Sequence, residues 1–398
     1  MIDYRNPYTP GAGTMPKYLA GRELLLESAR LAIKSITEGY QARSVAYYGL
    51  RGVGKTVILN AIETIAENEN ILVRHIEIQE KAGFAKSLAT ASTAFIMNLS
   101  SRERLKHGVE KLKSVVASFS ARWNPEDNTV SFGLDENRFA AAVAGTGDIT
   151  NDLTELFVAL GKYAKTANTA VCFCLDEMQY ARSEELEGMI AALHRCSQLN
   201  LPVLVFCAGL PKLLKSMSEA KTYSERLFEF VEVGSLSETA ARKAIEEPAE
   251  VLDVTYDESA VSKILAFSKG YPYFIQELCS TVWQEGEGKI VTSKMVEDAL
   301  AATINRLDLG FFRVRFSRCT SREQEFLFAM LDCGELPCTI ANVARNMNSA
   351  VTRISTFRAT LISKGLIYST GHGEVDYTVP QFDKFLERER VRANSSCG

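Results

Sequence analysis

The sequence Gly-Leu-Arg-Gly-Val-Gly-Lys-Thr at residues 49–56 is a complete G-x-x-x-x-G-K-T motif. An apolar, β-prone stretch (44–48) precedes it and residues with helical spacing (57–62) follow it, which is the strand–loop–helix context that a phosphate-binding loop needs. Glycine has no Cβ, so the backbone can curl and turn its N–H groups toward phosphates, while the helix N-terminus adds partial positive charge. The motif with these flanks predicts a nucleoside-triphosphate site rather than a chance glycine-rich turn.

The side chains of the motif suggest separate tasks. Lys55 can reach the β- and γ-phosphates, and the Thr56 hydroxyl can bind Mg²⁺. The residues expected to bind the nucleotide here are Gly49, Leu50, Arg51, Gly52, Val53, Gly54, Lys55, Thr56 and Val57.

An acidic partner for this loop lies at residues 171–177, Val-Cys-Phe-Cys-Leu-Asp-Glu. Five consecutive apolar residues are typical of a central parallel strand that is buried on both faces, and ligands of open α/β sheets bind at the carboxyl ends of such strands. We expect Asp176 to hold the Mg²⁺ and Glu177 to orient the attacking water. Taken alone, such a pattern is usually a strand that runs into a solvated loop; the motif at 49–56 favours the functional interpretation.

Composition restricts the class of protein. The chain has 398 residues, 46% hydrophobic and 24% charged, which is typical of a globular protein with two or three domains. The net charge of −4 means that any DNA binding must come from a local patch. No apolar run reaches the roughly 18–20 residues of a membrane span, and no signal core follows Met1, so we expect a cytoplasmic protein without membrane contact. The 9 cysteines and 4 histidines show no metal-site spacing, so a zinc site is not expected.

Strands alternate with helices through the first part of the chain, which predicts an α/β domain with a parallel sheet covered by helices on both faces. This domain is expected over residues 1–235, with an extended arm at 1–20 and an insertion or hairpin within 121–150. The expected strands are 45–48, 71–78, 171–177, 201–208 and 230–233. The expected helices run to about residue 36 and over 56–66, 84–120, 150–167 and 183–199.

Two further domains are expected. Residues 236–305 have a helical pattern, with helices at about 257–268, 272–285 and 293–304. Residues 306–398 predict a helix from Ser321, helices at 339–345 and 350–364, and a hairpin around Gly371-His372-Gly373. Three helices followed by a two-stranded wing are typical of a winged helix-turn-helix.

With these features the chain resembles the AAA+ and STAND branch of P-loop ATPases, and within it the initiator-type proteins that join an ATPase module, a helical lid and a C-terminal winged helix. The resemblance covers nearly the whole chain. It implies an αβα-sandwich P-loop fold, ATP and Mg²⁺ as cofactors, and hydrolysis of ATP to ADP and phosphate.

Three segments carry the resemblance beyond the loop. Leu19-Ala20-Gly21-Arg22-Glu23 matches a segment that lies against adenine in these families, so Gly21 and Arg22 are implied at the base; the alternative is a helix start. Arg226 resembles an arginine finger that reaches a neighbouring subunit's γ-phosphate, which implies an ATP-dependent homo-oligomer; the alternative is a surface arginine. Gly270-Tyr271-Pro272 resembles the Gly-x-Pro of STAND lids, which implies that Pro272 packs on the base; the alternative is a turn.

Two departures from the family pattern bear on the rate. The fourth strand ends in Cys207-Ala208-Gly209-Leu210-Pro211, without the polar sensor residue usual there, and Gly-Tyr-Pro stands where many lids carry a sensor arginine. Fewer charge-stabilising groups around the γ-phosphate imply slow hydrolysis.

The helix at 350–364 is the expected DNA reader. It presents Arg353, Arg358 and Lys364, and Ser349, Thr352, Ser355 and Thr356 could reach phosphates or base edges. His372 on the wing could touch a phosphate or the minor groove. The alternative is a winged helix that docks a protein.

These patterns favour an ATP-dependent molecular switch that binds duplex DNA and acts in replication, transposition or regulation. One alternative is a STAND-like signalling or defence ATPase whose winged helix controls oligomerisation. Another is a DNA-binding regulator that holds its nucleotide structurally. A protein partner is compatible with each of them.

Overall fold

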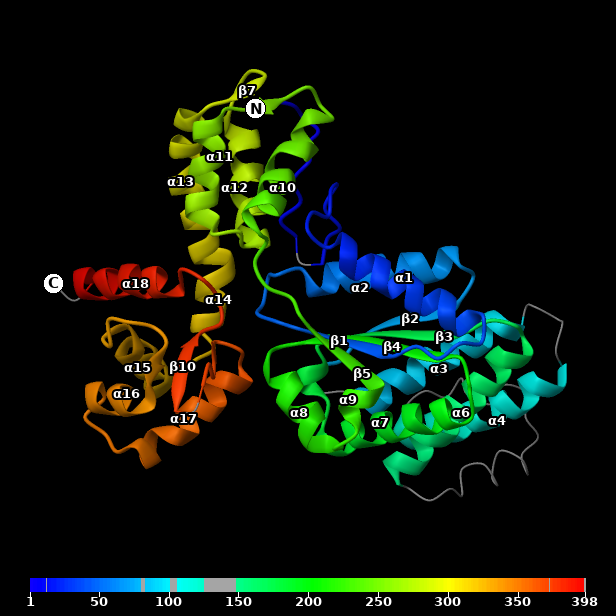
Figure 1. Ribbon diagram of the computed structural model, residues 1–398. Helices are drawn as coiled ribbons and strands as arrows, with labels where there is room; N and C mark the ends of the chain where they lie inside the picture. The colour runs from blue at the N-terminus through cyan, green and yellow to red at the C-terminus, as the bar shows by residue number, and fades with distance from the viewer. Residues whose placement is uncertain (12, 80–82, 101–105, 125–147, 372, 397–398) are drawn as a thin grey trace. The chain divides into compact units, whose positions relative to one another are not determined.

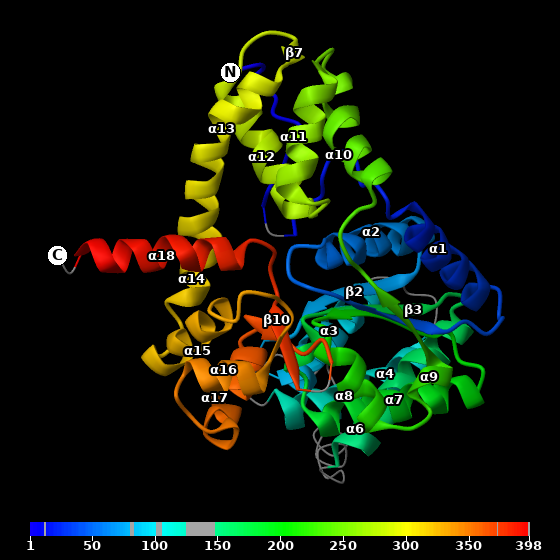
Figure 2. The same ribbon diagram turned by 60° about the vertical axis from the view of Figure 1, so that its left-hand side comes forward.

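The computed structural model describes residues 1–11, 13–79, 83–100, 106–124, 148–371 and 373–396. The chain forms two compact units (Figures 1 and 2). The α/β unit comprises Arg22–Gly49 and Gly54–Val233. The helical unit comprises Met1–Gly21, Leu50–Val53 and Gly234–Gly398.

The α/β unit is built on a five-stranded sheet in the order β2-β3-β4-β1-β5. Every neighbouring pair is parallel, and Ala46 of β1 lies between Cys207 of β4 and Phe230 of β5. The strands are β1 (Ser44–Tyr48), β2 (Leu72–Glu77), β3 (Val171–Asp176), β4 (Val203–Gly209) and β5 (Phe228–Glu232). The expectation of a parallel α/β sheet is confirmed.

Helices cover both faces of this sheet, which is why its central strands are buried throughout. Figure 1 shows α1 and α2 on one face and α3, α6 and α7 on the other. Phe173 of β3 contacts the rings of Phe95 and Phe157 on the second face. The helices are α1 (Glu23–Thr37), α2 (Lys55–Asn68), α3 (Gly83–Ser100), α4 (Lys106–Trp123), α6 (Ile149–Thr166) and α7 (Ser183–Gln198).

Several details differ from the expectation. The helical stretch after residue 84 is two helices, and α4 includes Trp123, which the pattern had placed in a turn cluster. Most of the expected insertion, residues 125–147, lies outside the described residues. Three short elements had not been expected: η1 (Met178–Tyr180), α8 (Lys212–Ala220) and α9 (Ser224–Leu227).

The helical unit begins with the N-terminal arm, which is bonded to the first helices of this unit. The Trp283 indole N–H donates to the Asp3 carbonyl at 2.9 Å, and the Asn6 amide donates to the Ser280 hydroxyl at 2.9 Å. Residues 1–21 therefore group with this unit, whereas the sequence pattern had placed them with the α/β domain; the domain limits stay a prediction. The helices are α10 (Glu238–Glu250), α11 (Glu258–Ser268), α12 (Pro272–Glu285) and α13 (Ser293–Arg306), with a short parallel pair β6 (Thr255–Tyr256) and β7 (Ile290–Val291).

The chain then continues through a π-helical turn, η2 (Leu307–Phe312), and α14 (Arg313–Phe316) into the C-terminal module. The module has three helices, α15 (Ser321–Leu331), α16 (Ile340–Asn346) and α17 (Val351–Ser363). The module also contains an antiparallel sheet with the strand order β8-β10-β9. Its strands are β8 (Cys338–Thr339), β9 (Ile367–Tyr368) and β10 (Glu374–Tyr377).

Two elements of the C-terminal module were not expected. Strand β8 adds a third strand to the hairpin, and α18 (Phe382–Ser396) follows it. The Arg388 guanidinium donates to both oxygens of the buried Asp308 at 2.6 and 2.8 Å, which ties α18 to η2. Within the described ranges, no helix has both the length and the apolar character that crossing a bilayer requires.

Candidate functional site

The loop at residues 49–56 joins β1 to α2, and glycine is required where it turns. Gly52 and Gly54 have φ angles of 81° and 94°, in the left-handed region that other residues avoid. The Gly49 N–H donates to the Gly209 carbonyl at 3.2 Å, which fixes the start of the loop at the carboxyl end of β4. Helix α2 begins at Lys55, so its first N–H groups point toward the loop.

Lys55 and the apolar positions of the loop are largely enclosed. The Lys55 ammonium is buried and donates to the Gly49 carbonyl at 2.9 Å, across the loop. Val53 is buried, while Leu50, Arg51 and Val57 are half-buried. The Lys55 ammonium therefore points into the space that the loop encloses. A phosphate group bound there would accept its hydrogen bonds.

Thr56 and Asp176 meet, although 120 residues separate them in the sequence. The Thr56 hydroxyl donates to Asp176 Oδ2 at 2.5 Å, and Asp176 is the last residue of the fully buried strand β3. A hydroxyl and a carboxylate are hard oxygen ligands, and Mg²⁺ in phosphate sites takes one or two such protein ligands and keeps several waters. The two oxygen ligands that Thr56 and Asp176 would provide fit Mg²⁺.

Glu177 follows directly and stands at the same edge of the sheet. Its φ of 55° is unusual for a non-glycine residue and is typical of positions that a functional site constrains. Its N–H donates to Asp176 Oδ1 at 2.8 Å. Its carboxylate accepts a hydrogen bond from the Gln179 amide, a partner that the sequence pattern did not suggest.

The two residues expected at the adenine are placed by different contacts. Gly21 has a φ of 68°, and a Cβ there would lie 2.6 Å from the Ala240 Cβ, so the helical unit needs glycine at this point. Arg22 precedes α1 in the α/β unit and is buried, and burial lowers the pKa of its guanidinium. Contact of Gly21 and Arg22 with a base stays a prediction.

Pro272 is the first residue of α12, where a missing N–H has no cost. The neighbouring Tyr271 packs, together with Tyr273, against Gly52 in the loop segment Leu50–Val53, which groups with the helical unit. A Cβ on Gly52 would lie 3.1 Å from Tyr271 Cε1. Burial raises the pKa of the Tyr271 hydroxyl above its usual value. The contact of Tyr271 with the loop was not expected from the sequence, and contact of Pro272 with a base stays a prediction.

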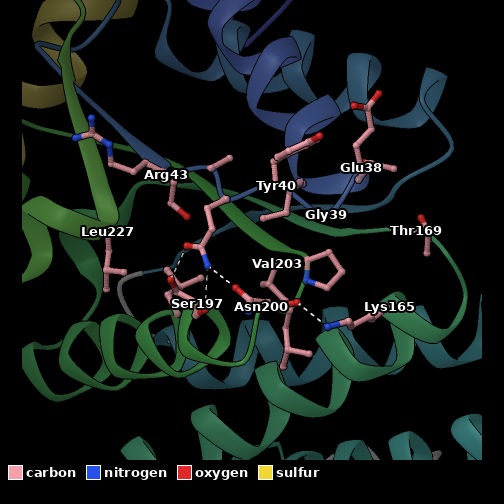
Figure 3. A pocket seen from close by; sticks show the side chains of 18 of the residues that line it. Glu38, Gly39, Tyr40, Arg43, Lys165, Thr169, Ser197, Asn200, Val203 and Leu227 are labelled. Carbon is pink, nitrogen blue, oxygen red and sulfur yellow. Dashed lines mark hydrogen bonds between the residues drawn. The ribbon is translucent and has the colours of Figure 1, made fainter.

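Arg226 lies at the opposite edge of the sheet. It is exposed at the end of α9, immediately before β5, and it lines a cavity of about 430 Å³ formed at the amino-terminal ends of the strands (Figure 3). Labelled residues of this cavity include Arg43, Thr169 and Val203, which mark where β1, β3 and β4 begin. Parallel strands place the phosphate-binding loop at their other end, so Arg226 is not part of the same subunit's phosphate site.

The three expected DNA contacts on α17 have different surroundings. Arg353 is exposed, whereas the Arg358 guanidinium donates to the Ser369 hydroxyl at 3.1 Å. The Lys364 ammonium donates to Glu323 Oε2 at 2.6 Å and to the Arg318 carbonyl at 2.9 Å. Lys364 therefore joins α17 to α15, and its expected DNA contact stays a prediction. His372 lies outside the described residues.

Comparison with known proteins bears on the first half of the chain. Residues 18–206 match the AAA ATPase domain family, and residues 309–386 match a domain of unknown function, DUF8462. No curated protein sequence gives a significant match.

Among solved structures, the chain is similar to a Walker-type ATPase of Pyrococcus abyssi, with 12% identity, a TM-score of 0.60, and coverage of 94% of this chain and 97% of that one. It is also similar to the Orc1 protein of Aeropyrum pernix in complex with DNA, with 18% identity, a TM-score of 0.45 and coverage of 95% of each chain. The RuvB Holliday junction branch migration motor of Thermotoga maritima matches with 14% identity, a TM-score of 0.44, and coverage of 94% of this chain and 99% of that one. At these identities the likeness concerns the fold alone.

The match of residues 18–206 to the AAA ATPase domain family supports ATPase activity, and the residues described above agree with a nucleotide site. Lys55, Thr56, Asp176 and Glu177 gather at one edge of the sheet, as the sequence pattern predicted. Arg226 lies at the amino-terminal ends of the strands, and the α17 residues belong to the helical unit. The sequence analysis missed Gln179 at this edge. Its only signal in the sequence was an amide side chain two positions after Glu177.

Proposed function

We propose that this protein is an ATP-dependent molecular switch that binds ATP with Mg²⁺, hydrolyses it slowly, and binds duplex DNA through its C-terminal module. The observation that carries the nucleotide part is the contact between Thr56 and Asp176, with Lys55 and Glu177 beside it. It joins the two halves of a phosphate site that lie 120 residues apart in the sequence.

Each residue at this edge has a proposed task. Lys55 binds the β- and γ-phosphates, and the backbone N–H groups of residues 49–57 surround them. Thr56 and Asp176 hold Mg²⁺, which when bound neutralises charge on the phosphate oxygens. Glu177 accepts a hydrogen bond from the attacking water and orients it toward the γ-phosphate. Gly21, Arg22 and Pro272 are proposed to contact the base.

Slow hydrolysis is expected because little positive charge lies near the reacting phosphate. β4 ends in Gly209 and Leu210, which place no side-chain cation or hydroxyl there. Arg226 is at the other edge of the sheet, so it can act only on a neighbouring subunit's nucleotide. We propose that ATP promotes a homo-oligomer in which Arg226 completes the neighbour's site; such a finger is worth about 10³- to 10⁵-fold in kcat.

The C-terminal module supports DNA binding through its arrangement and its charge. The order of helices α15, α16 and α17, followed by the β9–β10 hairpin, supports a winged helix-turn-helix, and we propose α17 as its recognition helix. Residues 336–373 contain no Asp or Glu, although the whole chain is acidic. The cations in this stretch are Arg345, Arg353, Arg358 and Lys364, of which Lys364 is already paired with Glu323. A local positive patch of this kind is what a DNA-binding module of an acidic protein needs.

One set of measurements tests the proposal. ATP turnover and mass photometry, each with ATP or ADP, should show slow hydrolysis and larger assemblies with ATP. Fluorescence anisotropy with duplex DNA at two salt concentrations should show affinity that falls with salt, because phosphate contacts release counterions. Arg353→Ala should weaken DNA binding by about 1–3 kcal/mol and relax sequence preference.

Matched variants separate the parts of the proposal. Lys55→Ala should lose most ATP affinity, because a hydrogen bond to a charged group is worth about 1.5–3 kcal/mol. Glu177→Gln should bind ATP as the parent does and turn over more slowly. Unchanged ATP binding by the Lys55 variant would contradict the assigned phosphate site.

The same measurements distinguish the alternatives. Steady turnover and nucleotide-dependent assembly without any duplex binding at low salt would favour a STAND-like ATPase whose C-terminal module controls oligomerisation, with a protein partner on α17. Tightly held ADP without turnover, together with DNA binding, would favour a regulator with a structural nucleotide. Neither result would agree with the proposed switch.

A further inference from the structure

Gln179 is a buried polar residue between the acidic strand and the end of β4. It lies in η1, two residues after Glu177, and is 7% exposed. Its amide N–H donates to Glu177 Oε2. Its Oε1 accepts the Leu210 backbone N–H at 3.0 Å. One side chain therefore connects Glu177 to the backbone immediately after β4.

The direction of this connection follows from hydrogen-bond chemistry. A backbone N–H can only donate, so the oxygen of the amide must face Leu210. An ionised carboxylate can only accept, so the NH₂ group must face Glu177. Both ends of the amide are thus defined by their partners, and the opposite orientation would leave the buried Leu210 N–H without an acceptor, at about 1–3 kcal/mol.

The end of β4 is shaped to receive this amide. A Cβ on Gly209 would lie 2.9 Å from Gln179 Oε1 and 2.9 Å from Leu213 Cδ2. Any side chain at Gly209 would therefore displace the amide. The amide of Gln179 occupies the space beside Gly209. A larger polar side chain at the end of β4 and Gln179 therefore exclude each other.

The short turn that carries Gln179 is itself held in place. The Tyr180 N–H donates to the Glu177 carbonyl at 3.0 Å, and the Ala181 N–H donates to the Met178 carbonyl at 3.1 Å. The side chain of Met178 is buried in the core of the α/β unit. Gln179 thus extends from a fixed backbone. A residue that positions another side chain needs such a rigid support.

We propose that Gln179 is a positioning residue for Glu177 and supplies, from η1, the polar group that β4 lacks. Its amide fixes one carboxylate oxygen of Glu177 and leaves the other to accept a hydrogen bond from water. Through Leu210 it also links the orientation of Glu177 to the end of β4. This inference rests on the proposed hydrolytic role of Glu177.

Two substitutions separate positioning from a structural role. Gln179→Met keeps the length and unbranched shape of the side chain but removes both hydrogen bonds. Gln179→Glu keeps an acceptor for the Leu210 N–H and removes the donor to Glu177. Both variants should lower kcat by about 10- to 100-fold, the range expected when a reacting group is misplaced by up to 1 Å. Binding of a fluorescent ADP analogue should stay within about threefold of the parent, since Gln179 is not assigned to the phosphates.

A purely structural role makes a different prediction. In that case Gln179→Glu, which retains the bond to Leu210, should turn over ATP like the parent, and Gln179→Met should mainly lower the melting temperature. Parental kcat in the Gln179→Glu variant would therefore overturn the inference, even if Gln179→Met failed to fold.

A double-mutant cycle with Glu177→Gln tests whether Gln179 acts through Glu177. In single-turnover experiments, adding Gln179→Met to Glu177→Gln should cause no further loss if the amide acts only by orienting that carboxylate. A further loss equal to that of the single Gln179→Met variant would overturn the inference. Failure of the proposed function gives a different result: Glu177→Gln alone would then hydrolyse ATP at the parental rate.

Discussion

Lys364 provides the sharpest test of how the C-terminal module is held together. Its ammonium bonds to Glu323 Oε2 at 2.6 Å and to the Arg318 carbonyl at 2.9 Å. Glu323 also accepts the Thr320 N–H at 2.7 Å, as part of the capping box that starts α15. We predict that Lys364→Met loosens the contact between α15 and α17 and leaves DNA binding largely unchanged.

The magnitude follows from the burial of the pair. The side chain of Glu323 is 5% exposed and that of Lys364 is 30% exposed. Removing one partner of a fully buried pair costs about 3–5 kcal/mol. Because Lys364 is partly in water, the loss of a hydrogen bond to a charged group, about 1.5–3 kcal/mol, is the better measure here. That range corresponds to an increase of about 10- to 150-fold in the local opening equilibrium.

Hydrogen exchange measured by mass spectrometry on the full chain is the assay. At pH 7, peptides from α15 and α17 should exchange about 10- to 150-fold faster in Lys364→Met than in the parent, while peptides from β3 should not change. Lys294→Met is a matched control, because Lys294 pairs with Asp298 on the surface with both side chains more than half exposed, and such pairs contribute about 0–1 kcal/mol.

The contact between Lys364 and Glu323 also predicts how the stability of the C-terminal module depends on pH. Burial raises the pKa of Glu323. Hydrogen bonds from Lys364 and Thr320 lower it by more than burial raises it, so the pKa is below the usual 4.5. A carboxyl group with a lowered pKa stabilises the fold above its unfolded pKa and loses that contribution as the pH falls through its folded pKa. The difference in stability between parent and Lys364→Met should therefore be full at pH 7 and shrink below pH 4.5.

Two results would refute this reasoning. The first is equal exchange of α15 and α17 in the parent and in Lys364→Met at pH 7. The second is a DNA salt slope that flattens by roughly one unit in Lys364→Met while exchange is unchanged, which is the behaviour of a phosphate contact.

Three further predictions concern the α/β unit. Arg226→Ala should hydrolyse ATP poorly and regain part of its activity when mixed with Lys55→Ala, since mixed assemblies pair an intact loop with an intact finger; a steady-state assay of the mixture that shows no recovery would count against action between subunits. Phe173→Ala should destabilise the unit by about 3–5 kcal/mol, because the ring is fully buried between Phe95 and Phe157, and thermal unfolding without a lowered midpoint would contradict this packing. Gly54→Ala should cost about 1–2 kcal/mol through its φ of 94° alone, since no atom lies within 4 Å of the added Cβ, and should weaken ATP binding in a titration; parental affinity and stability would show that the loop tolerates the change.

Local patterns were sufficient for the nucleotide-binding edge of the sheet. The motif at 49–56 and the apolar run ending in Asp176 and Glu177 each combine a short-range signal with a known place in a parallel sheet. Because strands of a parallel sheet end at the same edge, the meeting of Thr56 with Asp176 followed from the assignment of two strands. The same logic predicted helices on both faces.

Other features depended on contacts that no local pattern carries. Helices α8 and α18 were missed, and α18 is held by the pairing of Arg388 with Asp308, which are 80 residues apart. Lys364 was expected at a DNA phosphate because it is a cation on the expected recognition helix. In the structure a carboxylate 41 residues earlier in the chain binds it.

The sequence alone determined that this chain has a phosphate-binding loop, an acidic strand to complete it, and a parallel α/β sheet, because these depend on residue type and on periodicity over a few residues. Only the tertiary structure decided that Gln179 contacts Glu177 and the end of β4, that Tyr271 packs on Gly52, and which cations of α17 have partners within the fold. These are facts about side chains that meet in space, and hydrogen bonding and close packing depend on distances of a few ångströms that sequence spacing does not encode.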